Sequence, residues 1–152
     1  LSLAPEHTET PILDLMNKPA YSSYKNFENA FERANNELGK KQYIVPYFIA
    51  GHPGTSLKDM YELSLSLREQ KKRVQQVQTF IPIPMTMSTA MYYTELHPKT
   101  LKPLQVAKGE ERFMQRALLQ PSLKKNHKYL RMALKRLGKL NQFDYLVGGR
   151  KY

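Results

Sequence analysis

Residues 43–84 constrain the fold most, because two apolar runs there are separated by a glycine-rich turn and an amphipathic segment. The first run covers residues 43–49 and the second covers residues 77–81. Between them, apolar residues recur every three or four positions from Leu57 to Leu67, which is the spacing of one buried helical stripe. The pattern predicts a strand, a crossover helix and a second strand parallel to the first.

The turn after the first run has the chemistry of a candidate ligand site. Gly51 and Gly54 let the backbone turn sharply and approach a ligand without a Cβ in the way. Ser56 and Asp59 have the spacing of a capping box, so a helix should begin there with free N–H groups near the strand end. Ligands of parallel sheets bind outside the carboxyl ends of strands. A plain strand-to-helix turn fits the same residues equally well.

Both predicted strands contain irregular features. Pro46 removes a donor from the sheet, so the first strand is expected to be irregular or to lie near an edge. Polar residues alternate along residues 77–81, which fits a polar face toward a cavity or a solvent-facing edge.

Four segments together resemble the YgiQ-type family of radical S-adenosylmethionine (SAM) proteins. They are LAPEH, KKQYIVPYFIAGHPG, VQTFIPIPMTMSTAMYYT and LKPLQVAKGEERFMQRALLQ, in this order, and the resemblance runs from Leu3 to about Leu137. Within them, IAGHPGTS is similar to the turn after the fifth barrel strand of many radical SAM proteins, and FIPIPMT to the turn after the sixth. Met85 stands where the family usually has glycine, and Ser56 where it has threonine.

The resemblance implies an α/β fold in two parts. Residues 1–93 would form the C-terminal half of a radical SAM partial (β/α) barrel, and residues 94–152 a basic, mostly helical extension. A carboxylate at Glu6 could accept hydrogen bonds from the ribose hydroxyls or the ammonium group of SAM. Without the resemblance, Glu6 and His7 are also compatible with a solvated loop pair. The cofactor-binding residues implied at the strand ends are Glu6, His7, Ile49, Gly51, His52, Pro53, Gly54, Ser56, Phe80, Pro82 and Pro84.

The resemblance also implies cofactors for the full-length enzyme, namely SAM and a [4Fe-4S] cluster that together generate a 5'-deoxyadenosyl radical acting on an unidentified substrate. The cluster-binding cysteines would lie upstream, in the N-terminal half of the same protein, which is then the partner of this chain. The chain has no cysteine, so it cannot hold a thiolate-ligated cluster alone. We therefore expect no catalytic and no metal-binding residue in it, no cofactor bound by it alone and no activity of the isolated chain.

Charge is placed unevenly along the chain. Residues 1–98 carry 10 Lys and Arg and 10 Asp and Glu, whereas residues 99–152 carry 14 and 3, so the net charge of +11 lies in the last third. Helices are predicted over residues 110–120 and 126–137. A basic surface there could bind phosphates, which keeps open a non-catalytic nucleic-acid-binding module or an acidic partner. A solvated face that contacts no polyanion fits equally well. The basic residues are Lys124, Lys125, Lys128, Arg131, Lys135 and Arg136.

The N-terminal third is expected to be scaffold. Thr10 before Pro11 is a typical helix start, and apolar residues from Tyr24 to Leu38 form a helical stripe expected in the core rather than around a cofactor. Half a barrel would leave two open sheet edges, so the chain could fold in a rearranged or oligomeric form. The sequence shows no apolar run near 18 residues and no signal peptide, which predicts a cytoplasmic protein without a membrane partner.

Overall fold

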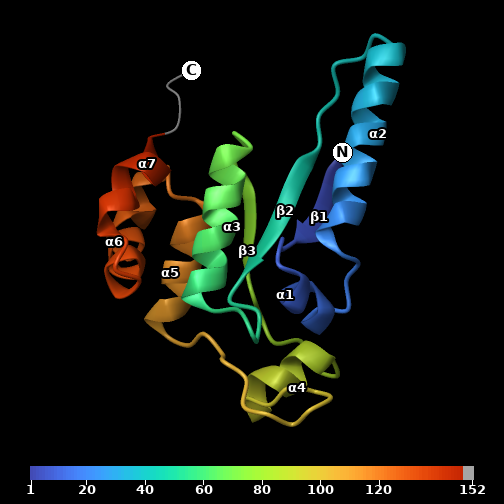
Figure 1. Cartoon of the computed structure of the whole chain (residues 1–152). Coiled ribbons are helices and arrows are strands. Elements are labelled where there is room, and N and C mark those ends of the chain that lie inside the picture. Colours follow the sequence, from blue (N-terminus) through green and yellow to red (C-terminus); the bar gives the residue numbers. More distant parts are fainter. Residues whose placement is uncertain (149–152) are drawn as a thin grey trace.

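A computed structural model describes residues 1–148 and contains a small parallel sheet flanked by helices (Figure 1). The strands are β1 (Ser2–Glu6), β2 (Val45–Ala50) and β3 (Gln76–Thr79), arranged in the order β1-β2-β3 with both pairs parallel. Parallel neighbours require crossover connections, and helical segments join each strand to the next. The α/β prediction and the strand-helix-strand unit are confirmed.

Seven helices surround this sheet within the described residues. Two short 3-10 turns, η1 (Lys124–Asn126) and η2 (Leu140–Gln142), precede the last two helices. The helices are α1 (Thr10–Leu15), α2 (Tyr21–Glu37), α3 (Leu57–Glu69), α4 (Met87–Thr94), α5 (Glu110–Leu119), α6 (His127–Arg136) and α7 (Phe143–Val147).

The start of α3 forms the predicted capping box. Ser56 Oγ accepts a hydrogen bond from the Asp59 N–H at 3.2 Å, and Asp59 Oδ2 accepts one from the Ser56 N–H at 2.8 Å. The Asp59 carboxylate therefore provides the negative charge that favours a helix N-terminus. The Asp59 carboxylate thus already occupies part of the helix N-terminus, where the sequence suggested that free N–H groups could bind a ligand.

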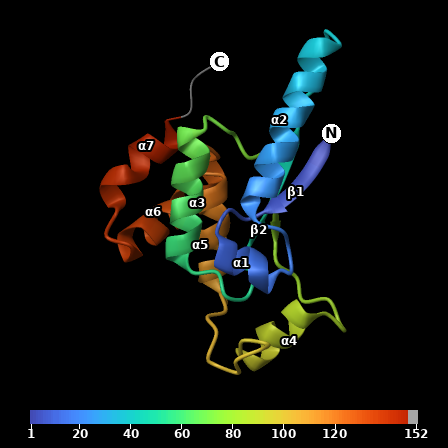
Figure 2. The same cartoon turned by 45° about the vertical axis from the view of Figure 1, so that its right-hand side comes forward.

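The core lies between one face of the sheet and a layer formed by α3 and α5. In Figures 1 and 2, α6 and α7 lie on the outer side of this layer. Helix α5 contacts β2, β3, α3 and α6, so it joins the last third of the chain to the sheet. The largest fully buried side chains of this core are Phe48, Met60, Leu63, Met114, Leu118, Leu130 and Leu134.

The other face of the sheet is more exposed and more polar. In the register of β2 and β3, Tyr47 lies opposite Gln76 and Ile49 opposite Gln78. Both glutamines are exposed, and the Tyr47 hydroxyl donates a hydrogen bond to Gln78. Side chains alternate between faces along a strand, so Gln76 and Gln78 share the face opposite buried Phe48.

Pro46 lies in the central strand, so the alternative that placed it near an edge is wrong. The alternative of an irregular strand is confirmed, because the β1–β2 register shifts between Leu3, which pairs with Pro46, and Glu6, which pairs with Phe48. β1 and β3 each have an unpaired outer edge within residues 1–148.

The prediction that the stripe of α2 is core is wrong for most of the helix. Tyr24 is buried, but Phe27 is 45% and Leu38 is 67% exposed. The reason is that α2 runs past the end of the sheet in both views, where no other described element covers it (Figures 1 and 2). Helical periodicity identifies an apolar face but does not say what covers that face.

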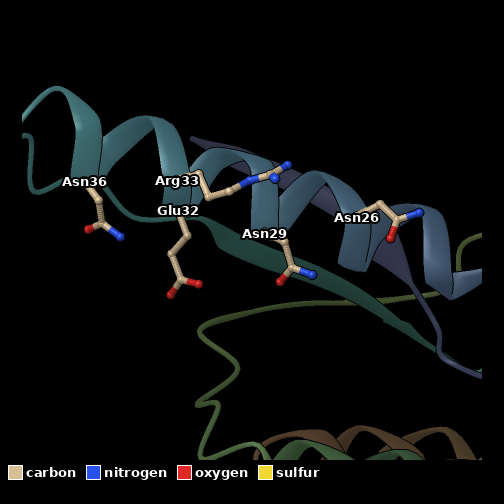
Figure 3. Close-up of a pocket in the computed structure, with 5 residues that line it drawn as sticks. All are labelled: Asn26, Asn29, Glu32, Arg33 and Asn36. Carbon is tan, nitrogen blue, oxygen red and sulfur yellow. The ribbon is translucent and has the colours of Figure 1, made fainter.

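A shallow polar hollow lies along the surface of α2. Its lining side chains all come from this one helix and are exposed, as Figure 3 shows, and no candidate site residue lines it. It is an open surface along the helix rather than an enclosed site. The lining residues are Asn26, Asn29, Glu32, Arg33 and Asn36.

Candidate functional site at the strand ends

The carboxyl ends of the three strands meet at one edge of the sheet, and α4 lies beyond that edge (Figure 1). The Phe80 N–H donates to the Ala50 carbonyl at 2.7 Å, which joins the segments that leave β2 and β3. The edge thus brings together the three segments that the sequence singled out. Of the candidates, His7, Gly51, His52, Pro53 and Phe80 are buried, Glu6, Ile49, Gly54, Ser56 and Pro82 are partly buried, and Pro84 is exposed.

The end of β1 is not a solvated loop pair. Glu6 adopts a φ of +62°, and its half-buried carboxylate forms an ion pair with Lys18 at 3.2 Å. His7 is fully buried. The alternative of a solvated loop pair is therefore wrong for His7.

His7 is a buried neutral imidazole. Burial lowers its pKa from the ordinary 6.5 to about 4; the charge of Asp59 opposes this shift and that of His52 adds to it. His7 Nδ1 accepts a hydrogen bond from the Glu9 N–H at 3.0 Å, so the ring proton of the neutral form is on Nε2. Within residues 1–148, neither this Nε2 nor the buried Thr55 Oγ1 has a hydrogen-bond partner. The site therefore contains two buried polar atoms that a polar ligand could satisfy.

We expect the stability of the chain to fall as the pH drops from about 6.5 to about 4. Unfolded His7 binds a proton near pH 6.5 and folded His7 only near pH 4, so the unfolded state binds more protons in this window. The free energy of unfolding should decrease by roughly 3 kcal/mol across it. Urea unfolding at several pH values should show this slope in the wild type and in His97→Gln, and a clearly smaller slope in His7→Gln, in which buried His52 still contributes in the same direction. An unchanged slope in His7→Gln would contradict the buried neutral histidine.

His52 ties the turn after β2 to α4. Its Nδ1 donates to the Pro53 carbonyl at 2.8 Å, and its Nε2 accepts from Ser88 Oγ at 2.8 Å. The ring also meets Phe80 edge-on, with centroids 5.4 Å apart. Burial lowers the pKa of His52, although the bond to Pro53 opposes the shift. Both ring nitrogens are occupied, so His52 holds the turn and α4 together.

The two glycines of the turn have different surroundings. Both have positive φ, +77° at Gly51 and +90° at Gly54, which side chains rarely adopt. A Cβ at Gly51 would meet only Arg112 Cγ, at 3.8 Å. A Cβ at Gly54 would lie 2.3 Å from Leu15 Cδ1 and 3.3 Å from Leu104 Cδ1. Packing within the chain therefore accounts for Gly54, whereas Gly51 leaves space beside its backbone.

Met85, where the resembling family usually has glycine, adopts a backbone conformation that favours glycine. Its φ is +66° and its side chain is fully exposed. The chain then enters α4, where Thr86 Oγ1 accepts a hydrogen bond from the Thr89 N–H at 3.2 Å. The side chain of Met85 therefore does not prevent the turn.

Two residues of α5 were missed by sequence reasoning. Gln115 is fully buried; its Oε1 accepts from the Gly51 N–H at 2.9 Å and its Nε2 donates to the Thr55 carbonyl at 2.8 Å. Arg112 donates to the Phe80 carbonyl at 2.7 Å. The available signal was a glutamine on the buried face of an amphipathic helix, which requires a buried hydrogen-bond partner.

The basic surface of the last third forms as the sequence predicts. All six side chains are exposed on η1 and α6, and those of Lys124, Lys128, Arg131 and Lys135 recur at helical spacing. Arg136 lies 3.9 Å from the carboxylate of Glu111. The other five have no carboxylate partner within residues 1–148.

A groove of about 600 Å³ lies near the start of β3, between the ends of α3 and α5 and helix α7. Leu67, Val74 and Leu119 contribute to its apolar wall, and Lys71 and Arg73 are among its basic residues. It contains none of the strand-end candidates. Within residues 1–148, no three His, Asp, Glu or Cys side chains could hold a metal ion, and no helix is long and apolar enough to cross a membrane.

Comparison with known proteins places the chain in a family. Residues 75–150 match the family described as "Domain of unknown function (DUF3362)", so the chain belongs to this family. It is also similar to UPF0313 proteins. That of Geobacter sulfurreducens is 43% identical over 150 residues, which cover 98% of this chain and 25% of the relative.

The UPF0313 protein of Vibrio vulnificus is 42% identical over 99% of this chain and 20% of its own length. That of Methanosarcina acetivorans is 44% identical over 93% of this chain and 19% of its own length. The chain thus spans about a fifth to a quarter of the relatives it matches. No solved structure matches it.

Proposed function

We propose that this chain is the C-terminal part of a cytoplasmic radical SAM enzyme, in which it forms one side of the SAM site and part of the wall of the substrate cavity. The observation that carries the proposal is the meeting of three segments, LAPEH, IAGHPGTS and FIPIPMT, at the carboxyl ends of three consecutive parallel strands. Ligand sites of barrel enzymes form at such an edge. The more polar open face, with Tyr47 and Gln78, would face the cavity.

The residues at the edge fit SAM. The Gly51 backbone carries no side chain and has room for a further atom in ordinary contact with Arg112, and His7 Nε2 and Thr55 Oγ1 are buried polar atoms without partners among the described residues. Glu6 could bind ribose hydroxyls or the ammonium group. SAM held at this site, with a [4Fe-4S] cluster bound elsewhere in the full-length protein, would supply the radical chemistry of the reaction. The chain's own residues would hold SAM, orient it and exclude water.

The residues of this chain do not fit an iron-sulfur cluster, because cluster irons are bound mainly by cysteine thiolates and the chain has none. We infer that the N-terminal half of the same protein binds the cluster. The greater length of the UPF0313 relatives is compatible with that division. The proposal is tested by assaying SAM cleavage in the full-length protein beside this chain alone.

A second candidate function is the binding of a polyanion by the basic surface of η1 and α6. It is favoured by four exposed cations at helical spacing, Lys124 on η1 and Lys128, Arg131 and Lys135 on α6, with further basic residues beside them in the sequence. Exposed charge acts by counterion release, so such binding depends steeply on salt.

Replacing Lys124, Lys125, Lys128 and Arg131 with glutamine should remove most binding to RNA, DNA or heparin. A protein that contacts about six phosphates loses roughly a thousandfold in affinity between about 50 and about 200 mM salt, and the variant should show a clearly smaller slope. The matched control replaces four exposed lysines elsewhere, Lys40, Lys41, Lys58 and Lys99, and loses the same charge. No binding at low salt, or equal effects of both quadruple variants, would show that the surface is only a solvated face.

A further inference from the structure

The turn after β2 is held from the inside by one side chain of α5. The Gln115 amide bonds to both ends of this turn, because its Oε1 accepts from the Gly51 N–H at 2.9 Å and its Nε2 donates to the Thr55 carbonyl at 2.8 Å. Gln115 is fully buried, and more than 60 positions separate it from Gly51. Water therefore cannot replace these bonds without opening the core.

Other bonds of the turn do not duplicate those of Gln115. The Thr55 N–H donates to the His52 carbonyl at 3.0 Å, within the turn, and the Gly54 N–H donates to the Gln105 carbonyl at 2.7 Å. Gly51, with its φ of +77°, is the residue whose backbone has space beside it, and Gln115 fixes the direction of its N–H. The Gln115 contact therefore sets the position of the peptide proposed to lie nearest the ligand.

Only a side chain with the length and the donor-acceptor pair of glutamine makes both bonds. Methionine matches its length and volume but has no amide, and asparagine keeps the amide on a shorter stem. Arg112, one helical turn earlier, donates to the Phe80 carbonyl at 2.7 Å. Helix α5 thus reaches the segments that leave two neighbouring strands.

From this geometry we infer that Gln115 is a positioning residue for SAM binding. It links the helical last third of the chain to the cofactor side of the sheet by fixing the turn of residues 51–55. The inference rests on the proposed SAM site. Gln115 acts through the backbone of the turn and has no role in the chemistry itself.

The test compares Gln115→Met with Gln120→Met in the full-length protein. Gln120 follows α5 and donates to the Gln75 carbonyl at 3.1 Å, at the opposite end of β3 from the site, so it is a glutamine amide of the same helix end that does not contact the turn. SAM affinity is measured by equilibrium binding. Gln115→Met should weaken it at least about tenfold, as expected when buried polar groups lose their partner. Gln120→Met should not change it.

Hydrogen exchange of the peptide covering residues 50–56 gives a readout that is independent of SAM. The Gly51 amide should exchange much faster in Gln115→Met than in the wild type, and at the wild-type rate in Gln120→Met. Amides of α3 should stay protected in both variants. If the wild type does not bind SAM, the proposed function fails, and faster exchange still supports the positioning of the turn by Gln115.

Wild-type SAM affinity in a folded Gln115→Met variant, or unchanged exchange at Gly51, would overturn the inference. If Gln115→Met does not fold, Gln115→Asn is subjected to the same two measurements, and the same outcomes decide. The shorter amide cannot reach both ends of the turn, so it should also weaken SAM binding and speed exchange.

Discussion

Gly54→Ala is expected to destabilise the chain by roughly 2–3 kcal/mol, and Gly51→Ala by only about 1–2 kcal/mol. Both substitutions place a side chain at a positive φ. The difference comes from space, because the new Cβ at position 54 would lie 2.3 Å from Leu15 Cδ1 and that at position 51 would meet only Arg112 Cγ at 3.8 Å. Leu15 and Leu104 would have to move apart to accommodate the first.

The effects of the two substitutions on SAM binding should have the opposite order, with the larger effect at Gly51. In the full-length protein, Gly51→Ala should weaken SAM binding more than folded Gly54→Ala does, because the Cβ at position 51 lies beside the backbone proposed to be nearest the ligand. Urea unfolding and equilibrium SAM binding of the two variants check the two halves of the prediction. Equal stability losses would contradict the packing account of Gly54, and unchanged SAM affinity in Gly51→Ala would contradict the placement of Gly51.

The features that sequence predicted well are local. The stripe from Leu57 to Leu67 and the capping box at Ser56 involve residues within a few positions of one another, so periodicity and spacing specify them. The strand ends were also predicted, because parallel strands joined by a crossover must bring their carboxyl ends to one edge. These rules located the candidate site without any contact information.

The features that sequence missed depend on distant contacts. The bonds of Gln115 to Gly51 and Thr55 cross 60 or more positions, and no local pattern encodes such a pairing. The space that Gly54 leaves is filled by Leu15 and Leu104, which flank it from far along the chain in both directions. For α2, the apolar stripe was identified correctly, but Phe27 and Leu38 are exposed, because helical periodicity does not say what covers an apolar face.

The largest expected effect is on SAM cleavage, which we expect from the full-length protein and not from this chain alone. In the full-length protein, an N-terminal half with cluster cysteines would complete the site, whereas this chain has none and should form no cluster. Cluster formation and SAM cleavage are expected in the full-length protein and are expected to be absent from the isolated chain, because no residue of the chain supplies thiolate ligands. The His7 variant tests stability and the Gly51 and Gln115 variants test SAM binding, whereas the comparison of the full-length protein with this chain tests whether the cluster is bound outside the chain.

The most direct measurement is therefore anaerobic reconstitution of both proteins with iron and sulfide, followed by reduction in the presence of SAM. Cluster absorbance and released 5'-deoxyadenosine are measured for the full-length protein and for this chain. The account predicts a cluster and deoxyadenosine from the full-length protein and neither from the chain alone. A cluster-loaded full-length protein that releases no deoxyadenosine, or steady SAM cleavage by the isolated chain, would contradict it.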